Sequence, residues 1–255
     1  MPVKKMIFKN PEIFIGTSGW CYDGWEGVFY PDNLSRKEWL GFYAKHFDTV
    51  EINSSFYHLP KASTFSDWAK KTPDDFLFVV KASKCITHTK RLNDCSDAVA
   101  RLIDAAVELG KKLVMFLFQL PPNLKKDLNR LKNFIDTLPA VYRYVFEFRD
   151  ESWFCNDIYK LLKDCNCGIV ISDSPRFPRH EVITGGFCYI RMHGSTSLYS
   201  SKYTDKELKI IAEMITGNYK NGISSYVFFN NDVCGYAVEN AKLLKSLLLK
   251  AVRRK

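Results

Sequence analysis

The sequence predicts an α/β fold, a single-domain (β/α)8 TIM barrel that spans residues 1–255. Eight short apolar runs have the length of strands, and most of them are separated by segments with helical periodicity. Such alternation is typical of a parallel sheet, and eight units in 255 residues favour a closed barrel over an open doubly wound sheet. The chain has no Gly/Ser-rich or Pro-rich linker, which favours one domain over two.

The predicted strands are short runs rich in apolar residues, many of them β-branched or aromatic, which pack well on a pleated sheet. The fourth run is apolar throughout, as expected for a strand that is buried on both faces of a parallel sheet. In chain order the predicted strands are Ile13–Thr17, Thr49–Asn53, Phe76–Val80, Leu113–Phe118, Tyr144–Phe148, Gly168–Ser172, Phe187–Met192 and Tyr226–Phe229.

The segments between these runs carry apolar residues at helical spacing together with start and stop signals. Ser35–Glu38 and Thr204–Glu207 have capping-box sequences. Ser96 is expected to cap a helix that ends at Gly110. Further helices are predicted near residues 39–47, 65–69, 128–138, 156–165 and 237–252.

The alternation is interrupted between the sixth and seventh predicted strands. Residues Ser174–Gly186 contain two prolines and two glycines and show no helical pattern. We therefore expect the helix at this place to be missing or irregular.

The stretch Thr49–His58 shows the pattern on which the functional prediction depends. Glu51 and Asn53 are two residues apart on a predicted strand, so their side chains point to the same face of the sheet. A carboxylate and an amide that are buried together need polar partners, because an unpaired buried polar group costs free energy. The same spacing recurs near the ends of two other strands, in Glu147/Arg149 and Arg191/His193.

Polar residues follow or end almost every predicted strand. In a (β/α)8 barrel the functional groups gather at the carboxyl ends of the strands, so these side chains are expected to converge on one ring. The strand-end polar residues are Ser18, Glu51, Asn53, Lys81, Gln119, Glu147, Arg149, Asp173, Arg191, His193 and Asn230.

The residue types of this ring suit acid–base chemistry on an anionic substrate. Lys81, Arg149 and Arg191 can hold a carboxylate or phosphate group, and each arginine can bind it with two hydrogen bonds. Two carboxylates can serve as base and acid when their environments separate their pKa values, and histidine transfers protons near neutral pH. The predicted catalytic residues are Glu51, Glu147 and His193. The predicted substrate-binding residues are Asn53, Lys81, His88, Gln119, Arg149, Asp173, Arg191, Asn230, Trp20, Tyr57 and Trp153.

Two other interpretations of the ring are open. Its charges could neutralise one another as buried ion pairs, although a purely structural network has no reason to collect at one end of a barrel. Its oxygen and imidazole ligands could instead hold manganese, magnesium or zinc. Three nearby cations argue against a metal, and no Gly-x-Gly-x-x-Gly or Walker-type loop follows a strand, so we expect neither metal nor cofactor. The candidate metal ligands are Glu51, Glu147, Asp173 and His193.

Aromatic residues are expected around the ring, where they could stack on bases or sugars. The same side chains could instead form a hydrophobic lid that packs on itself. They follow the first, second and fifth strands and are Trp20, Tyr22, Trp25, Phe29, Tyr30, Phe56, Tyr57, Trp153 and Phe154. His88, Tyr199 and Tyr203 are expected in the same rim.

The formal net charge of +9 favours anionic partners. The lysines and arginines are scattered along the chain and include Lys4, Lys5 and Arg253–Lys255. This pattern fits a solvated basic surface or a weak, salt-sensitive affinity for nucleic acid.

No targeting or membrane segment is visible in the sequence. Residues Met1–Pro11 lack the apolar run of a signal peptide, and the longest apolar run, Leu113–Phe118, is far too short to cross a membrane. Eight cysteines without secretory context are expected to be reduced thiols, so we expect a cytoplasmic protein.

Several motifs spread from about Phe14 to Leu244 occur together in one known family. They are Gly16–Trp20, Phe29–Pro31, Val50–Tyr57, Phe118–Pro122, Phe146–Arg149 with Ser152 and Trp153, Arg191–Gly194 and Phe228–Asp232. On these motifs the sequence resembles the YecE-like family, domain of unknown function 72. The resemblance implies a TIM barrel and no established activity.

The resemblance also implies which positions belong to the motifs of that family. Ser55 stands where the family often has threonine, a change that keeps the hydroxyl group. A more distant, fold-level resemblance is to endonuclease IV and sugar isomerases, but their metal-ligand set is incomplete here. By position the family's motif residues are Glu51, Asn53, Lys81, His88, Gln119, Glu147, Arg149, Arg191, His193, Asn230 and Asp232.

The sequence is therefore interpreted as an enzyme that acts on a phosphate- or carboxylate-bearing substrate by acid–base chemistry, of hydrolase or lyase type. One alternative is a nucleic-acid-binding protein without catalysis. Carboxylates at the centre of the ring count against it, because they repel phosphate. The other alternative is a metal-dependent hydrolase or isomerase of the endonuclease IV type.

Overall fold

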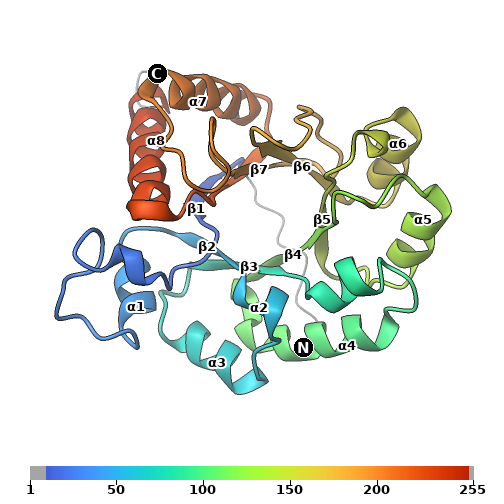
Figure 1. Ribbon diagram of the computed structural model, residues 1–255, viewed down its shortest axis with the longest axis horizontal. Helices are drawn as coiled ribbons and strands as arrows, with labels where there is room; N and C mark the ends of the chain where they lie inside the picture. The colour runs from blue at the N-terminus through green and yellow to red at the C-terminus, as the bar shows by residue number, and fades with distance from the viewer. Residues whose placement is uncertain (1–9, 253–255) are drawn as a thin grey trace.

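The computed structural model describes residues 10–252, in which eight parallel strands form a ring enclosed by helices (Figure 1). Each strand pairs in parallel with the next along the chain from the second to the eighth, and the eighth pairs with the first. The predicted (β/α)8 barrel is confirmed. The strands are β1 (Ile13–Thr17), β2 (Thr49–Ile52), β3 (Leu77–Lys81), β4 (Leu113–Gln119), β5 (Arg143–Glu147), β6 (Gly168–Asp173), β7 (Phe187–Met192) and β8 (Ser224–Phe229).

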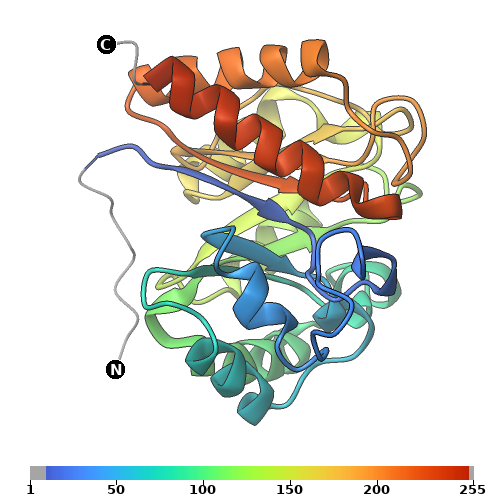
Figure 2. The ribbon, with the colours of Figure 1, turned by 90° about the vertical axis from the view of Figure 1, so that its left-hand side faces the viewer.

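Helices lie outside the ring and cover its apolar outer surface, and Figure 2 shows the last helix lying across the outside of β1. The α-helices are α1 (Trp39–Tyr43), α2 (Ser54–Tyr57), α3 (Ala62–Lys70), α4 (Ser96–Ala106), α5 (Leu128–Asp136), α6 (Asn156–Asp164), α7 (Asp205–Lys220) and α8 (Tyr236–Val252). Short 3-10 or π-helical turns are η1 (Asp23–Trp25), η2 (Cys85–Thr89), η3 (Val107–Lys112), η4 (Glu151–Trp153) and η5 (Val233–Gly235). The segment 174–186 between β6 and β7 contains no helix, as its prolines and glycines predicted.

The predicted helix starts are confirmed in one place and wrong in two. Thr204 and Glu207 form the predicted capping box at the start of α7. The Ser35 side chain bonds Glu38 at 2.7 Å, but this pair closes a turn before α1 rather than capping it. Ser96 is the first residue of α4 instead of its cap, and α4 gives way to η3 before Gly110 is reached.

The ring is closed between β1 and β2 by a side-chain hydroxyl. Within residues 10–252 these two strands share one isolated bridge instead of a ladder. The Tyr43 hydroxyl accepts the N–H of Thr17 at 2.9 Å and donates to the carbonyl of Thr49 at 3.1 Å. A Cβ atom on Gly16 would lie 2.1 Å from the same carbonyl oxygen, so the close approach of the strands requires glycine.

Side chains along each strand alternate between the barrel interior and the layer under the helices. On β7, Phe187 and Tyr189 belong to the interior apolar cluster, whereas Cys188 and Ile190 pack toward the helices. The next interior position is Arg191. Apolar side chains therefore fill the amino-terminal part of the barrel, and polar side chains close its carboxyl-terminal end.

No helix in the described part of the chain has both the length and the apolar character needed to cross a bilayer. The basic residues Lys4, Lys5 and Arg253–Lys255 lie outside the described residues.

We expect Tyr43→Phe to lower the free energy of unfolding by about 1–3 kcal/mol, because it leaves the buried N–H of Thr17 and carbonyl of Thr49 without this partner. Urea denaturation measures the change. The matched control is Tyr57→Phe, a tyrosine that is 75% exposed, which should change stability by less than about 0.5 kcal/mol. Equal effects of the two substitutions would show that the contact between β1 and β2 does not depend on the Tyr43 hydroxyl.

Candidate functional site

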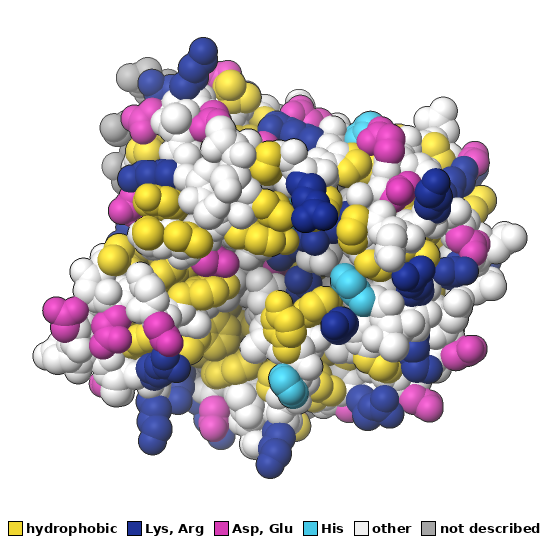
Figure 3. Space-filling model, viewed as in Figure 1, with side chains coloured by type: hydrophobic (Ala, Val, Ile, Leu, Met, Phe, Trp, Pro, Cys, Tyr) yellow, Lys and Arg dark blue, Asp and Glu magenta, His cyan; other side chains and the backbone are white. Residues whose placement is uncertain are grey.

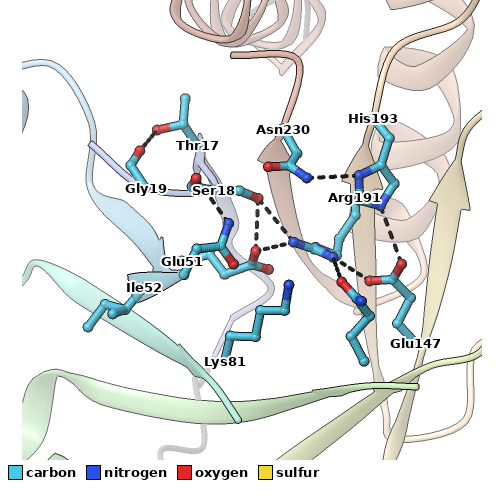
Figure 4. Close-up of polar contacts among 12 residues, drawn as sticks. Thr17, Ser18, Gly19, Glu51, Ile52, Lys81, Glu147, Arg191, His193 and Asn230 are labelled. Carbon is cyan, nitrogen blue, oxygen red and sulfur yellow. Dashed lines mark hydrogen bonds and ion pairs between the residues drawn. The ribbon is translucent and has the colours of Figure 1, made fainter. Parts of the chain in front are cut away.

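Arg191 lies at the centre of the polar ring and binds two carboxylates, one from β2 and one from β5 (Figure 4). Its Nη2 donates to Glu51 Oε1 at 2.6 Å, and its Nη1 donates to Glu147 Oε2. All three side chains are fully buried. Each buried charge would cost several kcal/mol without its partner, so the three side chains depend on one another.

Two neutral hydroxyl groups also donate to Glu51. Ser18 Oγ donates to Glu51 Oε1 at 2.8 Å, and the Tyr189 hydroxyl donates to Glu51 Oε2 at 2.5 Å. The sequence prediction did not include Tyr189. Its position two residues before Arg191 on β7 places it on the same interior face, which is the signal that could have found it.

Glu147 is bound from both sides. Arg149 Nε donates to Glu147 Oε1 at 2.8 Å, and Arg191 binds its other oxygen. Burial alone would raise the pKa of Glu147, but the two guanidinium groups outweigh it and hold that pKa well below its ordinary value. Glu147 is therefore a permanent carboxylate that positions the arginines, and the role of proton donor predicted for one of the two glutamates does not suit it.

His193 is a neutral side chain in this network. With the Asn230 amide donating to Nδ1 at 3.0 Å, the ring proton lies on Nε2, which faces Glu147 Oε1 at 3.4 Å. Burial lowers the pKa of His193 to about 4. The three predicted catalytic residues, Glu51, Glu147 and His193, are thus brought together, but all are fully buried and none reaches the surface of the site.

Lys81 is the cation of the ring that is left without an ion pair. It ends β3, its side chain points into the ring in Figure 4, and its Nζ lies 4.4 Å from the centre of the Phe56 ring. Within the described residues Nζ has no carboxylate or hydrogen-bond partner, and Lys81 as a whole is 8% exposed. Burial, and then the charge of Arg191, lowers the pKa of Lys81 to about 7.

The charge balance of the site depends on Lys81. The carboxylates of Glu51 and Glu147 are matched by the guanidinium groups of Arg149 and Arg191. A protonated Lys81 therefore adds one positive charge that no group of the described ring compensates. Such an excess charge, held mostly out of water, attracts an anion.

The outer side of the site is formed by Arg149 and its neighbours. Arg149 Nη2 donates to Gln119 at 3.0 Å and to the Tyr199 hydroxyl at 3.3 Å, and its guanidinium lies 4.1 Å from the centre of the Phe177 ring. Phe177 comes from the segment without a helix and was not predicted. Figure 3 shows a hollow near the centre of this face, bordered by apolar, Lys and Arg side chains.

His88 lies beside Lys81. Its ring packs edge-on against Phe56 with ring centres 5.0 Å apart, and burial followed by the charge of Lys81 lowers its pKa to about 4. The sequence prediction that placed His88 near the ring thus agrees with its position on η2.

A cavity of about 500 Å³ lies beside the ring rather than above it. Trp20, Tyr57 and Trp68 line it, and Asn53 connects it to the ring by donating to the Ser18 carbonyl at 3.1 Å. Basic residues also line this cavity, namely Arg36, Lys37 and Lys71.

Two predicted binding residues lie outside the site. On β6, Val170 belongs to the interior cluster, so Ser172 is also interior and Asp173 faces outward, where it bonds Arg179 and the Tyr203 hydroxyl. Trp153 is fully buried, and its Nε1 donates to the Leu124 carbonyl at 2.6 Å, so its ring is not available for stacking.

The predicted alternative of a metal site does not assemble from its four ligands. Asp173 lies outside the ring, and the Glu51 and Glu147 carboxylates are turned toward Arg191. The described residues contain no group of three or more His, Cys, Asp or Glu side chains that could hold a metal ion.

Asp232, which follows β8, is a second group that titrates near neutral pH. Burial raises its pKa to about 7, although the nearby Tyr22 opposes the shift, and its Oδ1 is buried without a hydrogen-bond partner among residues 10–252. Asp232 belongs to a motif of the resembled family but was not among the predicted site residues.

Comparisons with known proteins give one family. Residues 14–255 match the family model described as "Protein of unknown function DUF72". The chain is 28% identical to YunF of Bacillus subtilis (strain 168), over 92% of this chain and 94% of that protein, and 27% identical to YecE of Escherichia coli (strain K12), over 74% and 77%. The crystal structure of a DUF72 family protein from Thermotoga maritima MSB8 is 30% identical, covers 93% of this chain and 99% of its own, and superposes with a TM-score of 0.84.

We expect Arg191→Met to lower the free energy of unfolding by about 3–5 kcal/mol, because it leaves the buried carboxylates of Glu51 and Glu147 without their shared cation. The control is Arg36→Met, which removes an exposed ion pair with Asp23 and should cost less than about 1 kcal/mol. Urea denaturation compares the two. A stable Arg191→Met protein would show that the carboxylates do not need this cation.

Lys81 should also give the protein a pH-dependent stability. Its pKa is about 7 in the folded protein and 10.5 in its ordinary state, so between these pH values the unfolded chain binds more protons and stability rises with pH. Relative to Lys81→Met, the free energy of unfolding should increase by on the order of 5 kcal/mol across this range and change little below it. Denaturation curves at several pH values measure it, with the exposed Lys206→Met as control. Parallel pH profiles for the wild type and Lys81→Met would contradict the buried, unpaired amine.

Proposed function

Starting from the fact that the chain belongs to the DUF72 family, we propose that the carboxyl-terminal face of its barrel is an enzyme active site. The site binds a small substrate that carries a phosphate or carboxylate group and acts on it by acid–base chemistry, of hydrolase or lyase type. The observation that carries this proposal is the buried Lys81 amine without a counterion, next to a carboxylate–guanidinium network whose charges already cancel.

The anion is bound by Lys81 and Arg149. Arg149 donates from Nε to Glu147 and from Nη2 to Gln119 and Tyr199. Its Nη1 makes no hydrogen bond within residues 10–252. A guanidinium that is held in this way loses little freedom on binding, so it can present the free nitrogen to a carboxylate or phosphate oxygen.

Proton transfer is assigned to the two groups whose pKa values lie near 7. Lys81 can accept a proton when it is neutral, and Asp232 can donate one when it is protonated. Glu51, Glu147 and His193 act as positioning residues, because they hold the arginines and do not reach the ligand. The cavity lined by Trp20 and Tyr57 offers room for an apolar or planar part of the substrate.

Sulfate tests the anion site because its charge does not change near neutral pH. We expect sulfate to bind, and its affinity to fall as the pH rises through about 7, since the neutral Lys81 amine no longer attracts it. Lys81→Met and Arg149→Met should each weaken binding by about tenfold or more. Isothermal titration calorimetry at low ionic strength measures the affinity, with Lys206→Met as the control that should bind like the wild type. Absent binding, or binding that neither substitution weakens, would overturn the proposal.

A further inference from the structure

We propose that Lys81 is a nucleophile that forms a Schiff base with a small aldehyde or ketone that carries a carboxylate or phosphate group. The inference rests on the proposed function, because the same site must bind the anionic group. It goes further by naming the class of substrate and a covalent step, and it selects a lyase over a hydrolase.

The described residues contain two buried lysines, and their surroundings differ. The Lys112 amine is a structural donor: it bonds the carbonyls of Ala69 and Thr72 at 2.5 and 2.7 Å and the Thr72 hydroxyl at 3.2 Å. The Lys81 amine has no such acceptor and lies against the face of Phe56. A buried lysine without acceptors does not stabilise the fold by hydrogen bonding, so its position needs another explanation.

The charged groups that face Lys81 come from several strands, and the two carboxylates among them are engaged elsewhere. Glu51 on β2 accepts from Arg191 and Tyr189, and Glu147 on β5 accepts from Arg191 and Arg149. Arg149 and His88 complete the surroundings of the amine. Burial, and then the charges of Arg191 and Arg149, disfavour the ammonium form by more than Glu147 and Glu51 favour it. A neutral amine has the free electron pair that a nucleophile needs.

The side chains around Lys81 can supply the other contacts that a carbonyl substrate needs, one to its anionic group and two to its apolar part. Arg149 offers its free Nη1 to the anionic group, and Phe56 and Phe177 provide apolar walls. Lys81 is not completely sealed, because 8% of its surface is exposed, and a small molecule would approach the amine from that exposed side. Bound by its anionic group, such a molecule would hold its carbonyl carbon near the amine, which raises the effective concentration of the reacting groups.

The covalent step conserves atoms and electrons. The electron pair of Lys81 Nζ attacks the carbonyl carbon, and the carbonyl oxygen takes up the displaced π electrons and a proton. The two hydrogens of the neutral amine leave with this oxygen as water, and the nitrogen and carbon form a double bond. Protonation of that nitrogen gives a cation that accepts electrons from a neighbouring bond, which is the chemistry of carbon–carbon bond cleavage.

Reductive trapping tests the inference on the full-length protein. Pyruvate carries a carboxylate, dihydroxyacetone phosphate carries a phosphate, and acetone carries no charge. Each is incubated with the protein at neutral pH, sodium borohydride then reduces any C=N bond to a stable amine, and peptide mass spectrometry locates the adduct. We expect an adduct on Lys81 with at least one of the two anionic carbonyl compounds, none with acetone, and less in the presence of sulfate.

Variants and an internal control make the result decisive. Lys81→Arg keeps the positive charge and Lys81→Met keeps the apolar stem, so a folded form of either should lose this adduct. Lys112 should stay unmodified in the folded protein because its amine is fully engaged.

The outcomes separate this inference from the proposed function. Sulfate binding without any adduct on Lys81 would overturn the Schiff base and leave the anion site standing. If the protein neither binds sulfate nor forms an adduct on Lys81, both proposals are overturned. Modification of Lys81 by acetone as readily as by the two anionic compounds would overturn the requirement for an anionic group.

Discussion

The buried ion pairs of Arg191 with Glu51 and Glu147 are the interaction on which the carboxyl-terminal end of the barrel depends. Charges that are completely removed from water are tolerated only with well-placed partners. A single guanidinium from β7 therefore fixes side chains from β2 and β5 and links distant parts of the ring. Tyr189, Ser18 and the other neutral donors around it complete hydrogen bonds that water would otherwise supply.

This arrangement determines what the other polar residues can do. Because Arg191 and Arg149 already neutralise the two carboxylates, the amine of Lys81 is left as an unmatched charge. The residues that looked most like acid and base in the sequence are fully buried, and the groups whose pKa values lie near 7 are Lys81 and Asp232. His193 stays neutral because burial and the charges of Arg191 and Arg149 outweigh the Glu147 carboxylate at 3.4 Å.

Much of the fold was predictable because hydrophobic periodicity is a local property. All eight strands were located within two residues at each end, and the missing helix at 174–186 followed from its prolines and glycines. The contact between β1 and β2 was not predictable, because the hydroxyl of Tyr43 reaches Thr17 and Thr49 only when α1 is packed on the barrel. Side-chain spacing also predicted the pairs around Glu51 and Glu147. Asp173 was expected in the ring because it follows the sixth predicted strand, but alternation from the interior Val170 turns it outward.

The order of residues is enough to predict the barrel, the end of it that carries the polar residues, and the set of charges that meet there. How these charges are paired, and which side chains are buried, follows only from the folded structure. Pairing and burial depend on distances between strands, whereas a sequence shows only the order of residues along each strand. Lys81 and Trp153 illustrate this, because both were expected to contact a ligand. Trp153 is fully buried and donates to a backbone carbonyl, whereas the Lys81 amine makes no hydrogen bond to the described residues of the polar ring.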